Sequence, residues 1–135
     1  MSARILVVDD LEANRRLLEA LLTADYYDVI EASRGEEAVQ LAKREKPDLI
    51  LMDVMMPGGI DGYEACRRLK AQPETRHIPV VILTTLDDRE NRVRGLQAGA
   101  EEFLTKPIDD VQLMARVKSL LTLKVVIDEL RAREA

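Results

Sequence analysis

The chain has 135 residues, which suits one domain built around a single hydrophobic core. Its 25 acidic residues outnumber the 20 basic ones, and the formal charge of -5 argues against direct binding to nucleic acid or an anionic membrane, since both attract basic surfaces. The single cysteine, Cys66, cannot form an internal disulfide, and no signal-peptide pattern or membrane-spanning apolar run is present, so we expect a cytoplasmic protein.

Short aliphatic runs alternate with longer amphipathic segments in the first half of the chain. Residues 4–8 (RILVV) are rich in β-branched side chains and end before two acids, which predicts a buried strand. A helix is predicted over 14–24, a weaker strand over 27–32 and a second helix over 35–46. The apolar positions of the first helix are Leu17, Leu18, Leu21 and Leu22.

The second half of the chain continues this alternation. Strands are predicted over 49–52, 79–83 and 102–105, and a polar residue directly follows each of them. Helices are predicted over 63–72 and 88–98, and a last helix begins near residue 109. Five strand–helix units in succession predict an α/β fold, with a parallel sheet covered by helices on both faces.

Residues that carry chemistry follow four of the predicted strands. In chain order they are Asp9 with Asp10, Asp53, Thr84 and Lys106. Each alone has an ordinary interpretation, such as capping of the next helix. In a parallel α/β sheet, however, functional groups gather at the carboxyl ends of the strands. The joint pattern therefore predicts one polar site.

The chemistry of these side chains suits phosphoryl transfer. Three carboxylates in one pocket need a compensating cation, and Mg²⁺ is commonly held by one or two carboxylates plus a phosphate. The carboxylate of Asp53 can accept a phosphoryl group where a metal and the geometry support attack. Lys106 can neutralise one transferred oxygen, and Thr84 can hydrogen-bond another.

Four motifs, ILVVDD, LILMDVMMP, VVILTT and FLTKP, occur in this order over roughly residues 1–122. Together they resemble the receiver domain of two-component response regulators. The resemblance implies a flavodoxin-like, doubly wound sheet of five parallel strands in the order 2-1-3-4-5. It also implies a signalling switch domain rather than an enzyme, phosphorylated by a sensor histidine kinase or a histidine phosphotransfer protein.

The resemblance further implies a role for each residue of the predicted site. Asp53 would be the phosphoacceptor and would also contribute to the metal site. Asp10 would be a direct ligand of Mg²⁺ (or Mn²⁺), Asp9 would act mainly through metal-bound water, and the backbone carbonyl of Met55 would be a further ligand. The remaining assignments are Thr84 as the switch hydroxyl, Phe103 as the switch aromatic residue, and Lys106 as the phosphate-binding lysine with a cis bond to Pro107.

A closer resemblance is to the first receiver of response regulators in which two receivers precede a GGDEF diguanylate cyclase domain. It is carried by MSARILVVDD, RHIPVV, FLTKPIDD and VIDELRAREA. The chain has no GGDEF motif of its own. We therefore expect either a fragment of such a cyclase or a stand-alone receiver that acts by docking to other proteins.

The last predicted helix is longer than a receiver needs. Val111, Met114 and Val117 are expected to pack on the sheet, and the apolar pattern then continues to Leu130 without Gly or Pro. We therefore expect a receiver over 1–122 and a helical extension or linker over 123–135. This extension predicts a homodimer that forms on phosphorylation; a frayed, solvated end is the alternative.

The sequence departs from the family pattern at two positions. After Pro57 the usual Gly-x-Asp-Gly turn is one residue longer, reading GGIDG over 58–62, and its glycines are expected to absorb the insertion. Thr85 stands where the family usually has Ala, and its extra bulk is expected to narrow access to the phosphoryl group.

Three other functions fit the sequence less well. A phosphatase of the haloacid dehalogenase class needs an acid two residues after its nucleophile, where this chain has Met55. A flavodoxin-like FMN binder needs a phosphate-binding loop after the first strand, where Asp9 and Asp10 would repel phosphate. A phosphorylation-independent pseudo-receiver usually lacks an acid, the Thr or the Lys, and this chain has all of them.

Overall fold

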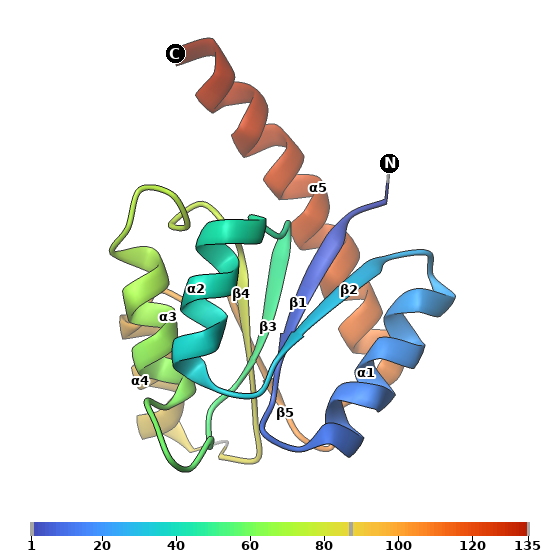
Figure 1. Ribbon diagram of the computed structural model, residues 1–135, viewed down its shortest axis with the longest axis vertical. Helices are drawn as coiled ribbons and strands as arrows, with labels where there is room; N and C mark the ends of the chain where they lie inside the picture. The colour runs from blue at the N-terminus through green and yellow to red at the C-terminus, as the bar shows by residue number, and fades with distance from the viewer. Residues whose placement is uncertain (1, 87, 135) are drawn as a thin grey trace.

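The computed structural model describes residues 2–86 and 88–134 as one parallel sheet between two layers of helices (Figure 1). The strands lie in the order β2-β1-β3-β4-β5, which confirms the predicted fold class and strand order. In chain order the elements are β1 (Arg4–Val8), α1 (Glu12–Ala24), β2 (Asp28–Ala32), α2 (Gly35–Glu45), β3 (Leu49–Asp53), α3 (Gly62–Lys70), β4 (Val80–Thr84), α4 (Arg89–Gln97), β5 (Glu102–Thr105) and α5 (Asp110–Glu134).

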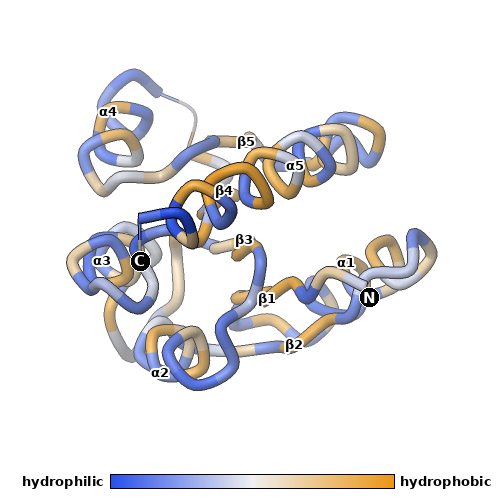
Figure 2. The backbone as a smooth tube through the Cα atoms, turned by 90° about the horizontal axis from the view of Figure 1, so that it is seen from above, coloured by the Kyte–Doolittle hydropathy of each residue, from blue (hydrophilic) through white to orange (hydrophobic). Residues whose placement is uncertain are grey.

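The three central strands are buried on both faces because helices cover both sides of the sheet. Helices α2, α3 and α4 lie on one side and α1 and α5 on the other (Figure 2). Every residue of β3 and β4 is buried, which explains why both read as continuous aliphatic runs rather than alternating patterns. Strands β2 and β5 form the two edges and are less buried.

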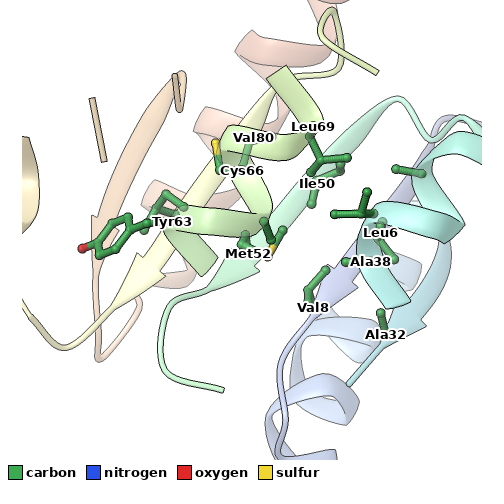
Figure 3. Close-up of a cluster of buried hydrophobic side chains, with 14 of the residues drawn as sticks. Leu6, Val8, Ala32, Ala38, Ile50, Met52, Tyr63, Cys66, Leu69 and Val80 are labelled. Carbon is green, nitrogen blue, oxygen red and sulfur yellow. The ribbon is translucent and has the colours of Figure 1, made fainter. Parts of the chain in front are cut away.

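Each face of the sheet has its own hydrophobic core. On the α2 and α3 side, Leu6, Ile50 and Met52 pack with Tyr63 and Cys66 (Figure 3). Burial raises the pKa of the Cys66 thiol to about 11, so this thiol stays protonated near neutral pH and belongs to the packing. The second core, on the α1 and α5 side, includes Ile5, Val7, Leu22, Leu51 and Leu113.

Two apolar residues that the periodicity placed toward the sheet are exposed. The prediction that Val111 packs on the sheet is wrong, because its side chain is 80% exposed and the fully buried residue of this turn is Leu113. Leu17 is 62% exposed, whereas Leu18 and Leu22 of the same helix are buried. The docked orientation of each helix selects one stripe from a wider apolar face.

Helix α5 runs without interruption to Glu134 and extends past the sheet at the amino ends of the strands (Figure 1). The second half of this helix still contacts the rest of the domain: Lys124 is only 9% exposed and lies at a groove with Ser2, Ala3 and Asp48. The Lys124 ammonium lies 2.5 Å from a carboxylate oxygen of Asp128, one turn further on. Within the described residues, no helix is both long and apolar enough to cross a bilayer.

Candidate functional site

The predicted site residues gather at the carboxyl edge of the sheet. Asp9 directly follows β1, and Asp53 and Thr84 are the last residues of β3 and β4. All three side chains belong to the buried part of the chain, with 2%, 8% and 2% of their surface exposed. Because parallel strands end at the same edge, residues separated by 30 or more positions meet here.

Three carboxylates and one ammonium group form the centre of the site. Asp9, Asp10 and Asp53 each offer an oxygen atom within 4.8 Å of the others. The Lys106 Nζ lies 3.0 Å from Asp53 Oδ1 and 3.3 Å from Asp9 Oδ2. The pairing of β4 with β5 brings Lys106, which directly follows β5, to the edge where Thr84 ends β4. The Lys106 backbone N–H donates to the Thr84 carbonyl at 2.7 Å.

The charges at this centre are only partly compensated. Burial raises the pKa of Asp53, and the hydrogen bond and positive charge of Lys106 act in the opposite direction. Burial acts to lower the pKa of Lys106, but the hydrogen bonds and charges of Asp53 and Asp9 outweigh it and raise that pKa. One ammonium group against three carboxylates leaves an excess of negative charge, which suits a hard divalent cation with oxygen ligands.

The two adjacent acids are placed differently. Asp9 is almost fully buried, and its carboxylate accepts hydrogen bonds from the Leu11 backbone N–H at 2.9 Å and from the Asn14 side chain at 3.2 and 3.4 Å. Much of its hydrogen-bonding capacity is therefore used by the start of α1. Asp10 is half-buried at the mouth of the same cluster. This arrangement favours Asp10 over Asp9 as a direct metal ligand.

Gly62 fixes the segment that follows Asp53. A Cβ built at Gly62 would overlap the carbonyl oxygen of Asp53, so only glycine fits here without movement of the backbone. The Gly62 backbone N–H also donates to the Val54 carbonyl at 2.9 Å, which closes the loop between β3 and α3. Sequence reasoning placed Gly62 in the turn but missed this contact.

Three further predicted residues lie outside the carboxylate cluster, at different distances from it along the chain. The Thr84 hydroxyl oxygen accepts a hydrogen bond from the Leu86 backbone N–H at 3.1 Å, so it faces the loop between β4 and α4. Met55 lies two residues beyond Asp53, with its side chain 60% exposed. Phe103 does not join the carboxylate cluster. It is half-buried on β5, with its ring 5.2 Å from the Arg92 guanidinium carbon of α4.

The expected cis peptide bond joins Lys106 to Pro107. A comparison with known families matches residues 5–118 to the response regulator receiver domain. This match covers most of the chain. The chain belongs to the response regulator receiver family.

Similar proteins support this assignment over the whole chain. The receiver is 64% identical to the response regulator PleD of Caulobacter vibrioides (strain NA1000 / CB15N) over all 135 residues, which span 30% of the length of PleD. This bears out the sequence resemblance to a response regulator. Receivers are signalling switch domains rather than a family of catalytic enzymes, in agreement with the resemblance drawn from the sequence.

Solved structures agree on the fold. The receiver domain of a signal transduction histidine kinase from Syntrophus aciditrophicus is 43% identical, with a TM-score of 0.84 over 90% of this chain and 91% of its own. The receiver domain of the sensor histidine kinase PA1611 from Pseudomonas aeruginosa PAO1 is 34% identical, with a TM-score of 0.83 over 90% of this chain and 99% of its own. That domain was crystallised with a magnesium ion coordinated in its active-site cleft.

Proposed function

We propose that this receiver accepts a phosphoryl group on Asp53 in a reaction that depends on Mg²⁺ or Mn²⁺. The observation that carries the proposal is the meeting of three carboxylates and the Lys106 ammonium group at one edge of the sheet. Asp10 would hold the cation directly together with Asp53 and the Met55 carbonyl, and Asp9 would act through metal-bound water. The cation would neutralise charge on the transferred oxygens.

The phosphoryl donor in this proposal is a sensor histidine kinase or a histidine phosphotransfer protein. A carboxylate oxygen of Asp53 forms a bond to phosphorus, the bond between phosphorus and the donor imidazole nitrogen breaks, and its electron pair stays on the imidazole. Lys106 is already within 3.0 Å of Asp53 and would hold one phosphoryl oxygen as a point charge. A cytoplasmic location suits this chemistry and the buried, unpaired Cys66 thiol.

Phosphorylation would change the surface through Thr84 and Phe103. The Thr84 hydroxyl oxygen accepts a hydrogen bond from the Leu86 N–H, so a Thr84 side chain that turns to donate to a phosphoryl oxygen would carry the loop before α4 with it. Phe103 packs under that helix, where a Cβ at Gly95 would lie 3.0 Å from its ring. Because the two are in direct packing contact, a movement of α4 would be coupled to a movement of the Phe103 ring.

The proposal is tested by incubating the wild-type chain with acetyl phosphate and Mg²⁺ and measuring its intact mass. We expect a gain of one phosphoryl group, mapped to Asp53 by tandem mass spectrometry of peptides after hydride reduction. A chelator added at the start should prevent the gain. Modification at another residue, or the same rate with the chelator, would contradict the assignment of the site.

The lifetime of the aspartyl phosphate gives a second prediction. Met55 and Leu86 line a groove of about 320 Å³ beside the site, and neither side chain can orient an attacking water by hydrogen bonding. We therefore expect a long-lived phosphoryl group. The double replacement Leu86→Glu with Met55→Asn should speed loss of the label about tenfold, because a positioned carboxylate can act as a general base. Unchanged decay, measured by intact mass over time, would show that access is limited elsewhere.

We also propose that phosphorylation promotes a homodimer through the C-terminal helical extension, residues 123–135, with residues 1–122 as the receiver. Leu123, Val126 and Leu130 are each about half exposed and share one side of α5 beyond the sheet. Beryllofluoride, which stands in for the phosphoryl group, should raise the mass seen in sedimentation. Truncation after Leu121 should weaken this assembly without preventing phosphorylation. If the full chain remains a monomer at high protein concentration both with and without beryllofluoride, the proposed dimer is contradicted.

The output of the natural protein is proposed to be a diguanylate cyclase outside this chain. The support is the sequence resemblance to receivers of that class of regulator, which extends into the last helix. The 64% identity to PleD likewise continues through all 135 residues, including the extension. Helix α5 would then be the element that carries the state of the receiver to the following domain.

A further inference from the structure

The loop after the phosphoacceptor is one residue longer than the family turn, and the start of α2 holds its tip. Residues Arg34 and Glu36 of that start hydrogen-bond Gly58 and Ile60 of the loop, and Gly35 between them lies against Ile60 so closely that an added Cβ would overlap its side chain. The Arg34 guanidinium donates a short hydrogen bond to the Gly58 carbonyl. Two segments that are 24 positions apart are thereby joined at the same edge of the sheet as the carboxylate cluster.

Glu36 makes the second contact. Its Oε2 accepts a hydrogen bond from the Ile60 backbone N–H at 3.3 Å, and its Oε1 is buried where a Cβ at Gly59 would lie only 2.5 Å away. The Glu36 pKa is lowered by its own backbone N–H, by the Ile60 N–H and by Arg34, so the carboxylate is charged at neutral pH. The absence of a side chain at Gly59 therefore gives the room that this carboxylate occupies.

The same loop is fixed at its base by Gly62, whose N–H donates to the Val54 carbonyl. Between base and tip lie Met55, Met56 and Pro57. Gly58 has φ of +92°, a conformation that glycine adopts without strain, so the turn at the tip needs this residue type. The contacts from α2 at the tip and the Gly62 N–H at the base therefore hold the two ends of the segment that includes Met55.

We propose that Arg34 and Glu36, here called the α2 clamp, are positioning residues for the divalent-cation site. They hold the lengthened loop and thereby limit the movement of the segment that carries the Met55 carbonyl, the proposed metal ligand. This inference rests on the proposed metal site and adds to it two residues from a different strand–helix unit. It explains how the chain keeps a functional loop despite the insertion.

The test is a titration of the wild-type chain and its variants with Mg²⁺ alone, followed by ¹H–¹⁵N NMR. Glu36→Ala should raise the Mg²⁺ dissociation constant about fivefold, less than the loss of a residue that supports a ligand directly, because the clamp acts through one carbonyl. Arg34→Ala should act in the same direction. Glu36→Gln keeps an acceptor for the Ile60 N–H and should bind Mg²⁺ nearly as well as the wild type.

Glu37→Ala is the matched control. It removes the same charge from the same turn of α2, but its carboxylate accepts from the Ser33 N–H at 2.8 Å and does not reach the loop. It should lower the melting temperature while leaving Mg²⁺ affinity within twofold. If Glu37→Ala weakens Mg²⁺ binding as much as Glu36→Ala does, the clamp is overturned. It is likewise overturned if neither Glu36→Ala nor Arg34→Ala changes Mg²⁺ affinity.

Deletion of Gly59 gives an independent check, because it restores the family length of the loop. In that background Glu36→Ala should change Mg²⁺ affinity less than twofold, since the shorter loop does not depend on α2. The same fivefold loss in both backgrounds would reveal a charge effect and reject the clamp. If the wild-type chain binds no Mg²⁺, the metal site and the clamp both fail; normal wild-type binding with unaffected variants rejects the clamp alone.

Discussion

Replacing Asp53 with asparagine is expected to abolish the phosphoryl gain with acetyl phosphate and Mg²⁺. An amide of nearly the same shape lacks the carboxylate oxygen that forms the bond to phosphorus. The fold should remain intact. Removal of one of three carboxylates within 4.8 Å should raise the free energy of unfolding without metal by about 1 kcal/mol, because burial and like charge both disfavour the ionised Asp53.

Intact mass spectrometry and chemical denaturation measure these two effects separately. Asp28→Asn is the matched control, since it makes the same change of charge on an exposed residue of β2. This control should gain the phosphoryl group at the wild-type rate. Modification of Asp53→Asn at the wild-type rate would show that another residue is the acceptor.

Gly62→Ala should have the largest effect on stability among the single substitutions considered. Its Cβ would overlap the backbone carbonyl oxygen of Asp53, and neither group is a flexible side chain that can move aside. We expect the free energy of unfolding to fall by about 3 kcal/mol, at the upper end for an overpacked position. Because the displaced carbonyl belongs to the phosphoacceptor itself, the rate of phosphorylation should fall as well.

Gly95→Ala separates this contact from a general effect of glycine replacement. Gly95 lies inside α4, and its added Cβ would meet the edge of the Phe103 ring at 3.0 Å, where a side chain can adjust. The better helix propensity of Ala offsets part of that cost, so stability should change by less than about 1 kcal/mol. Equal losses for the two variants in urea denaturation would disprove the special role of Gly62.

The parallel fold was predictable from the sequence because its strands are short and carry a strong signal. Residues of β1, β3 and β4 are aliphatic on both faces, and a helix follows each of them, amphipathic after β1 and β3 and polar after β4, so a parallel sheet covered by helices is the arrangement that buries these strands. The predicted ends of the elements differ from the observed ones by up to two residues, as at α1 and α3. Local periodicity predicts the type and approximate place of an element better than it predicts the residues at which the element begins and ends.

The polar centre was predictable for a related reason. Once the strands are parallel, Asp9, Asp53 and Lys106 must come to the same edge, whatever the loops between them do. The structure adds that the Lys106 ammonium contacts both acids and that Asp9 is tied to the start of α1. Their roles in phosphoryl transfer rest on the experiments above.

The sequence by itself determined which segments form strands and helices and which polar residues end the strands, because both follow from local patterns of side chains. Only the tertiary structure decided which helical residues face the sheet, such as Leu113 in place of Val111, and where Lys124 is buried. It alone joined the start of α2 to the lengthened loop. These features depend on how distant segments dock, and docking geometry is set by packing across the whole domain rather than by neighbours in the chain.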